Sequence, residues 1–149
     1  MVLDKARIGV SYEPWTYEVS RAKIREYAEA LGETDPRYFS DGDDAIAPPT
    51  FASLFTIIQG TQAMMADEQL GAHWSLVHGS QRYLYGTRPM RPGDVLTCTP
   101  RIAEIRSRGV NEMLTIEVDC RFADGEPAVL STATIVLLGS APSDDAEEA

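Results

Sequence analysis

Histidine and cysteine are both scarce in this chain of 149 residues, which has two of each. His73 and His78 have no close cluster of carboxylates, so the sequence lacks the ligand spacing of a metal site and we expect no metal. Cys98 and Cys120 lie in apolar, strand-like runs without a C-x-x-C pair, which favours buried free thiols in a reducing compartment. The first ten residues carry charges early and have no long apolar core, unlike a signal peptide. We therefore expect a cytoplasmic protein.

Positive charge is also in short supply, with 13 lysines and arginines against 23 acids and a formal net charge of −10. Such a chain repels phosphates, which argues against nucleic acid as a partner. The arginines are unevenly placed, because six fall between positions 82 and 108: Arg82, Arg88, Arg91, Arg101, Arg106 and Arg108. This zone predicts either a site for an anionic small molecule or a solvated face of a sheet.

No run of residues is apolar enough to predict a membrane span. The best candidate is Pro48–Met65, PPTFASLFTIIQGTQAMM, which two glutamines and a threonine interrupt near its middle. Its apolar residues occupy nearly all sides, which predicts a buried soluble helix, and the two prolines suit the start of a helix. At about 1.5 Å per residue, such a helix would rise ~27 Å, enough to cross a small domain.

The elements before this helix are predicted by periodicity and by capping residues. Alternation of aromatic or apolar with polar residues predicts a strand over Tyr12–Val19. Ser20 is a suitable N-cap for a helix that runs to Leu31, and Gly32 is a suitable end. Residues 33–47, rich in Asp, Gly and Pro, predict a loop that either is plain surface or carries the chemistry.

The second half of the chain predicts an antiparallel sheet, with strands expected at Trp74–Arg88, Val95–Arg106, Asn111–Ala123 and Pro127–Gly139. Pro and Gly at 92–93 and Asp-Gly at 124–125 mark turns. We therefore predict an α+β fold, a single domain over residues 1–139 in which a curved antiparallel sheet covers the long helix. Residues 140–149, acidic and without large apolar side chains, predict a disordered tail.

A single sheet of this kind leaves an edge or an outer face partly apolar. Residues 135–138 are apolar on both faces of the last expected strand, which predicts a place inside the sheet or at an interface. A dimer that continues the sheet would cover the exposed edge.

Three motifs together resemble the MaoC-type hydratases and dehydratases, in particular the N-terminal-half type of that group. They are Ala47–Phe51 at the helix entrance, His78–Tyr83 in a strand, and Arg88–Val95 at a turn, and the resemblance covers roughly residues 10–139. It implies a hot-dog fold, dimers or pseudo-dimers joined along the sheet, and acyl thioesters of coenzyme A or acyl carrier protein as ligands. The implied reaction is reversible addition of water to a trans-2-enoyl thioester, with no cofactor beyond the thioester carrier.

The resemblance also implies an acid–base pair, which this chain does not carry in its usual form. Active members have an Asp and, five residues later, a His in a loop that corresponds here to Gly32–Tyr38. Glu33 replaces the Asp, Asp35 an Asn, and Tyr38 the His, and a phenol with an ordinary pKa near 10 exchanges protons poorly at neutral pH. The chain thus resembles the non-catalytic subunits of heteromeric dehydratases, whose partner hot-dog chain supplies the Asp and His.

The candidate catalytic residues are therefore Glu33, Tyr38 and His78, each with a structural alternative. Glu33 and Tyr38 form either an altered acid–base pair or part of a structural loop, and His78 is either an acid–base group or a hydrogen-bonding strand residue. Gly79 either lets a ligand approach the backbone or forms a bulge. The helix start offers N–H groups to a thioester carbonyl, and the candidate substrate-binding residues are Pro49, Thr50, Phe51, Gly79, Gln81, Arg82 and Arg91.

Three functions remain open at this point. The first is a tunnel-forming subunit of an (R)-specific enoyl-thioester hydratase or 3-hydroxyacyl-thioester dehydratase, paired with a dyad-bearing chain. The second is a stand-alone homodimeric hydratase or thioesterase, although the long helix has none of the carboxylates that a thioesterase would need before Asp67. The third is a module that binds acyl-CoA without chemistry.

Overall fold

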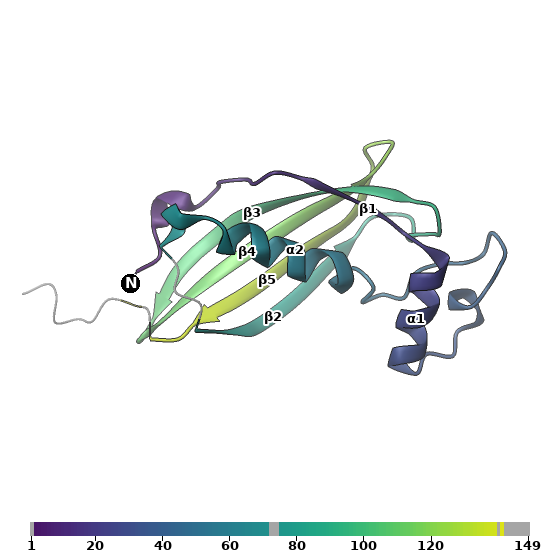
Figure 1. Cartoon of the computed structure of the whole chain (residues 1–149), viewed down its shortest axis with the longest axis horizontal. Coiled ribbons are helices and arrows are strands. Elements are labelled where there is room, and N and C mark those ends of the chain that lie inside the picture. Colours follow the sequence, from purple (N-terminus) through teal and green to yellow (C-terminus); the bar gives the residue numbers. More distant parts are fainter. Residues whose placement is uncertain (1, 72–74, 140, 142–149) are drawn as a thin grey trace, which may run out of the picture.

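The computed structural model describes residues 2–71, 75–139 and 141. One curved five-stranded sheet carries a long helix, α2, across one of its faces, and a second helix, α1, lies beyond one end of the sheet (Figure 1). Neighbouring strands are antiparallel in the order β1-β3-β4-β5-β2, with bounds β1 Trp15–Glu18, β2 Leu76–Tyr85, β3 Val95–Arg108, β4 Asn111–Phe122 and β5 Pro127–Leu137. The predicted α+β architecture is confirmed. His73, Trp74 and most of the acidic tail lie outside the described residues.

Helix α1, Arg21–Leu31, has the two ends that its sequence predicts. The Ser20 hydroxyl accepts a hydrogen bond from the backbone N–H of Lys23 at 3.0 Å, which satisfies one of the free donors of the first turn. Gly32 adopts a left-handed conformation, with φ of 70°, and its N–H donates to the carbonyls of Ala28 and Glu29.

Helix α2, Ser53–Met65, ends where predicted but begins five residues later than Pro48. The N–H of Phe51 donates to the carbonyl of Pro48, and the N–H of Ser53 to that of Thr50, both three residues back. These bonds close tight turns ahead of the α-helical pattern, so the prolines lead into the helix without belonging to it. No helix among the described residues is long and apolar enough to cross a membrane.

All five strands differ in length from the prediction, β1 and β2 by the most. Strand β1 starts at Trp15, and the segment before it contacts β3 through separate backbone bonds, such as that from Tyr12 to Pro100. Strand β2 ends at Tyr85, before the turn region that the sequence placed after Arg88.

The core lies between α2 and the sheet face that α2 covers. Alternate residues of β4 are buried, as predicted: Leu114, Ile116, Val118, Cys120 and Phe122. Tyr17 of β1 stacks on Phe55 of α2 with 4.3 Å between ring centroids. The two cysteines are free and buried, directly opposite each other on β3 and β4. A hydrogen bond with Cys98, together with burial, raises the pKa of the Cys120 thiol.

A buried carboxylate that the sequence did not reveal ties the N-terminal segment to the sheet. Glu112 of β4 is fully buried, and both of its carboxylate oxygens accept the backbone N–H of Leu3, at 3.0 and 3.1 Å. A charge-assisted hydrogen bond of this kind compensates part of the cost of burying the carboxylate.

A second carboxylate, Asp67, joins the end of α2 to the N-terminal segment. Its Oδ2 accepts from the Tyr12 hydroxyl at 2.6 Å and lies 2.7 Å from Nη2 of Arg7. Burial alone would raise the pKa of the Asp67 carboxyl, but the hydrogen bonds from Tyr12 and Arg7 outweigh it and hold the pKa below its ordinary value.

We expect Asp67→Asn to lower the free energy of unfolding by about 1 kcal/mol at pH 7 and by progressively less below pH ~4. The folded-state pKa lies below the unfolded value, so the stabilisation is complete above the unfolded pKa and disappears as pH falls through the folded pKa. Urea unfolding of both proteins at pH 7, 5, 4 and 3 measures this difference. Glu68→Gln, at an exposed neighbouring acid, is the control, and a pH-independent difference for Asp67→Asn would contradict the prediction.

Candidate functional site

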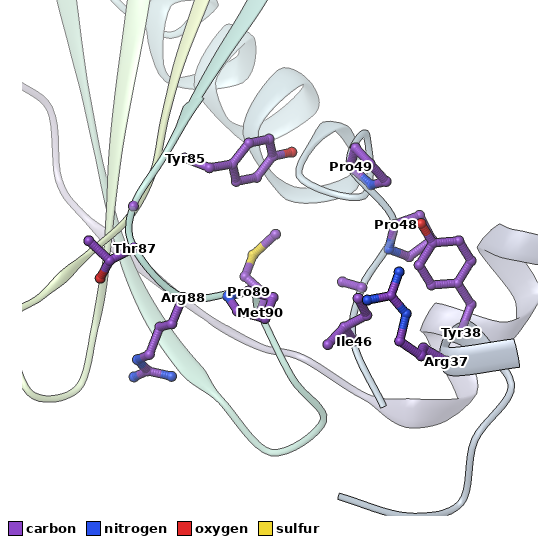
Figure 2. Close-up of a pocket in the computed structure, with 12 residues that line it drawn as sticks. Arg37, Tyr38, Ile46, Pro48, Pro49, Tyr85, Thr87, Arg88, Pro89 and Met90 are labelled. Carbon is purple, nitrogen blue, oxygen red and sulfur yellow. The ribbon is translucent and has the colours of Figure 1, made fainter. Parts of the chain in front are cut away.

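A pocket of about 320 Å³ opens between the loop after α1 and the segment that joins β2 to β3 (Figure 2). Residues 37–49 form one wall, the loop wall, and residues 85–90 form the opposite one, the strand wall. Tyr85 points across the opening toward Pro49 (Figure 2). The lining residues are Arg37, Tyr38, Ile46, Ala47, Pro48, Pro49, Tyr85, Gly86, Thr87, Arg88, Pro89 and Met90. Most of the lining is apolar, which suits a hydrocarbon-bearing ligand.

Short backbone bonds hold the two walls at a fixed spacing. The N–H of Ala47 donates to the carbonyl of Met90 at 2.8 Å, which ties the loop to the strand wall. The N–H of Gly86 donates to the carbonyl of Ala128 at 3.0 Å and fixes the other wall to β5. Backbone hydrogen bonds therefore hold both walls of the pocket in place.

Tyr38, the residue in place of the expected histidine, lines this pocket. It belongs to a short 3-10 helix, Pro36–Tyr38, whose N-cap Asp35 accepts the N–H of Arg37 at 3.0 Å. Burial raises the pKa of the Tyr38 phenol, and the carboxylates of Asp35 and Glu33 raise it further. The phenol therefore stays protonated near neutral pH and offers a hydrogen-bond donor, not a base.

The two carboxylates of this loop have different environments. Hydrogen bonds from Arg37, 2.6 Å away, lower the pKa of Asp35 to about 2, so Asp35 is a fixed anion. Glu33 is exposed, close enough to influence Tyr38 but not among the lining residues. The loop therefore brings only one member of the expected pair, Tyr38, to the pocket wall.

His78 lies away from this pocket. It is exposed on β2, where its Nε2 is 3.0 Å from the carbonyl of Ser80, and that carbonyl can only accept. Seven residues separate it from Tyr85, or ~23 Å along a strand. Within one chain, His78 and Tyr38 do not share a site. The β2–β5 register shifts between His78 and Ser80, so Gly79 sits at a bulge or irregularity.

The expected carbonyl-binding residues at the start of α2 are divided between pocket and core. Pro49 lines the pocket, whereas Phe51 is fully buried. The carbonyl and the hydroxyl of Thr50 accept from Tyr27, at 2.9 and 2.8 Å. The first N–H groups of α2, from Ser53 to Phe55, already donate to backbone carbonyls of the preceding turns.

The arginines between positions 82 and 108 have different environments in the structure. Arg101 and Arg106 form ion pairs with Glu117 and Glu104, as expected of a solvated sheet face. Arg88 lies 3.2 Å from Asp94 and 3.4 Å from Asp124, and stacks over the Phe122 ring at 3.4 Å from its centroid. Through these contacts Arg88 joins the turn before β3 to the turn between β4 and β5, which is a structural role.

The two arginines among the substrate-binding candidates lie on different sides of the molecule. Arg82 is exposed opposite Thr132, on the outer face of the sheet. The guanidinium of Arg91 donates to the carbonyl of Asp43 and, with Arg21, lines a neighbouring hollow of about 350 Å³. Arg91 is thus the candidate arginine closest to the pocket loop. The described residues hold no group of three or more His, Cys, Asp or Glu side chains that could bind a metal ion.

Sequence reasoning missed the strand side of the pocket, in particular Tyr85. The signal was available, because alternation along a strand places residues 81, 83 and 85 on one face. The sequence alone could not show that this face is the one under α2.

Gly86 is required where the pocket wall meets β5, because a Cβ built there would lie 1.9 Å from the carbonyl oxygen of Pro127. We expect Gly86→Ala to lower the free energy of unfolding by about 1–3 kcal/mol, since the backbone must move to relieve the clash. Thermal unfolding should show a Tm lower by about 2–4 °C per kcal/mol, and Thr87→Ala is the matched neighbouring control. An unchanged Tm for Gly86→Ala would contradict the prediction.

The amino-acid sequence of this chain is similar to that of a known protein family. Residues 6–131 match the family model described as "FAS1-like, dehydratase domain region". A UPF0336 protein of Thermobifida fusca is 40% identical over 152 residues, which cover 96% of this chain and 99% of the relative. One of Streptomyces coelicolor is 40% identical over 146 residues, covering 91% of this chain and 95% of the relative.

Solved structures show the same fold. A chain of the C-terminally truncated HadBC (3R-hydroxyacyl-ACP dehydratase) complex from Mycobacterium tuberculosis superposes with a TM-score of 0.71 at 24% identity, covering 87% of this chain and 96% of that one. A chain of the ChsH1-ChsH2 complex from the same organism gives 0.70 at 17% identity, covering 94% and 89%. This chain therefore belongs to the FAS1-like dehydratase-domain family, and its helix-on-sheet architecture is the hot-dog fold of the MaoC-like dehydratases.

Proposed function

We propose that this chain is the tunnel-forming subunit of a cytoplasmic (R)-specific enoyl-thioester hydratase or 3-hydroxyacyl-thioester dehydratase of fatty-acid metabolism. A partner hot-dog chain supplies the Asp and His that move protons. The observation that carries this proposal is the state of Tyr38, which lines the pocket in place of the expected His while its pKa is raised further above neutrality. No cofactor is required, since the coenzyme A or acyl-carrier-protein thioester is itself the substrate.

The chemistry explains why a partner is needed. Addition of water to C3 of an enoyl thioester requires a base that removes a proton from water and an acid that protonates C2. A protonated phenol cannot be the base at neutral pH, and Glu33 lies off the pocket lining. The Asp35 carboxylate, with its pKa lowered to about 2 by hydrogen bonds from Arg37, is too weak a base. The chain offers an apolar pocket and hydrogen-bond donors, which can bind the substrate but cannot transfer its protons.

The surface supports a second hot-dog chain as the partner. Among the described residues, strand β2 is an edge of the sheet, because it pairs with β5 alone, and it exposes Val77 and Leu84. The outer side of α2 exposes Ile58 and Met65. An apolar strand edge beside apolar helix residues is suited to a partner that continues the sheet. The two superposable complexes are named as pairs of distinct chains, which agrees with a heteromer.

Arg91 and Arg21 support an anionic carrier. They line the hollow next to the pocket, where a phosphate-bearing carrier could lie while its acyl chain enters the apolar space. A thioesterase is less well supported, because α2 carries no carboxylate between Ser53 and Met65.

We expect the purified chain alone to give no measurable hydration of crotonyl-CoA or of a longer enoyl-CoA. Turnover, followed as loss of the conjugated thioester absorbance, should appear when a hot-dog chain with an intact Asp and His is added. In that complex, Glu33→Ala and His78→Ala in this chain should leave kcat within about twofold, because neither group moves a proton. Robust turnover by the lone chain, abolished by either substitution, would instead make it an enzyme with an altered acid–base pair.

A further inference from the structure

The loop wall of the pocket leaves no backbone N–H group free for a ligand. Four of its six lining residues have an N–H group, and each donates within the protein: Arg37 and Tyr38 to Asp35, Ile46 to Arg37, and Ala47 to Met90. The other two, Pro48 and Pro49, have no N–H group. A hydrogen bond from this wall to a ligand must therefore come from a side chain.

Two side chains of the loop wall can donate a hydrogen bond, those of Arg37 and Tyr38. The Arg37 guanidinium turns to the Asp35 carboxylate, to which Nε and Nη2 donate at 3.1 and 2.6 Å. The Tyr38 hydroxyl has no hydrogen-bond partner in the part of the chain that the structure describes. It is therefore the neutral donor that this wall leaves free.

The Tyr38 side chain is also within reach of a ligand. It lines the open pocket of about 320 Å³, although the residue as a whole is only 8% exposed. Its ring extends from the short helix Pro36–Tyr38 toward Pro48 and Pro49, which line the same wall (Figure 2). A donor that is shielded from most of the bulk water binds an acceptor more strongly than one on the open surface.

The strand wall offers less suitable donors. Tyr85 carries its hydroxyl toward the opening, but the residue is 38% exposed, so water can satisfy this hydroxyl with or without a ligand. Arg88 is paired with Asp94 and Asp124. Thr87 points away from the loop wall (Figure 2). A ligand in the pocket therefore gains most from a hydrogen bond on the loop side.

The environment of Tyr38 indicates the chemistry of the group that it binds. Burial and the carboxylates of Asp35 and Glu33 raise the pKa of the phenol, which keeps it a donor at and above neutral pH. The same carboxylates disfavour a further negative charge beside the phenol. Because most of the pocket lining is apolar, the matching ligand carries a neutral acceptor on an apolar chain. The carbonyl of an acyl thioester has this chemistry.

We propose that the Tyr38 hydroxyl binds the thioester carbonyl of the acyl ligand by donating a hydrogen bond to its oxygen. This inference rests on the proposed function and names the residue that holds the reacting end of the substrate. The first N–H groups of α2, which the sequence suggested for this role, already donate to backbone carbonyls. A donor at the carbonyl also stabilises the negative charge that grows on its oxygen during hydration.

The test compares octanoyl-CoA with S-octyl-CoA, a thioether that has a methylene group in place of the carbonyl. Titration calorimetry on the full chain should show that octanoyl-CoA binds about three- to tenfold more tightly. Tyr38→Phe should reduce this ratio to below about twofold and leave the affinity for S-octyl-CoA unchanged. Tyr17→Phe, which removes a phenol hydroxyl outside the pocket lining, is the matched control and should keep the wild-type ratio.

The infrared spectrum of bound octanoyl-CoA, labelled with a heavy isotope at its carbonyl carbon, gives a second readout. A hydrogen bond lowers the stretching frequency of a carbonyl. We therefore expect a lower frequency in the wild type and in Tyr17→Phe than in Tyr38→Phe. A purely structural role of Tyr38 would leave this frequency unchanged. Tyr38→Phe should keep the fold, because its hydroxyl has no partner among the described residues to lose.

Three results would overturn the inference and leave the acyl-thioester pocket intact. The first is equal affinity of the wild type for the two ligands. The second is an equal loss of both affinities in Tyr38→Phe, which is the result expected if Tyr38 binds an amide carbonyl of the pantetheine arm. The third is loss of the ratio in Tyr85→Phe instead of Tyr38→Phe, which would move the carbonyl to the strand wall. Failure of both ligands to bind would overturn the proposed function itself.

Discussion

The close contact between helix α2 and the middle of the sheet is the constraint on which the rest of this molecule depends. At Gly60 the helix approaches β4 so closely that an added Cβ would lie 3.0 Å from a methyl carbon of Val118. Glycine inside a helix costs about 1 kcal/mol relative to alanine, and the apolar contact with the sheet offsets that cost. Phe51 and Phe55 then anchor the start of the helix against Tyr17 of β1. The pocket lies at the entrance to this helix, where Pro48 and Pro49 line it.

Sequence patterns predicted correctly those features that depend on interactions between residues close together in the chain. Alternation fixed the buried face of β4, and Ser20 and Gly32 fixed the ends of α1, because capping bonds form within a few residues. The start of α2 was wrong by five residues, since tight turns after Pro48 compete with an α-helix that begins there. The burial of Glu112 was not predictable, because its partner, the N–H of Leu3, lies 109 residues away in the sequence.

The sequence motifs predicted some residues of the candidate site, but not how these residues are arranged in space. The resemblance brought attention to Tyr38 and to the entrance of α2, and the structure places Tyr38 and Pro49 on the pocket wall. It could not show that His78 lies far along β2, because that depends on strand register and direction. Nor could spacing show the partners of the arginines: Arg88 pairs with Asp94 and Asp124, whereas the Arg91 guanidinium donates to the carbonyl of Asp43.

The altered loop and the apolar pocket together support the proposed function. At the loop, Tyr38 stands where the resemblance expects a histidine, and burial keeps its phenol protonated. Most of the pocket lining beside it is apolar, and the backbone bond from Ala47 to Met90 joins the loop to the segment before β3. An apolar pocket without a proton-transfer pair at its wall can bind an acyl chain but cannot add water to it. Under the proposed function, this is why the chemistry requires a second chain.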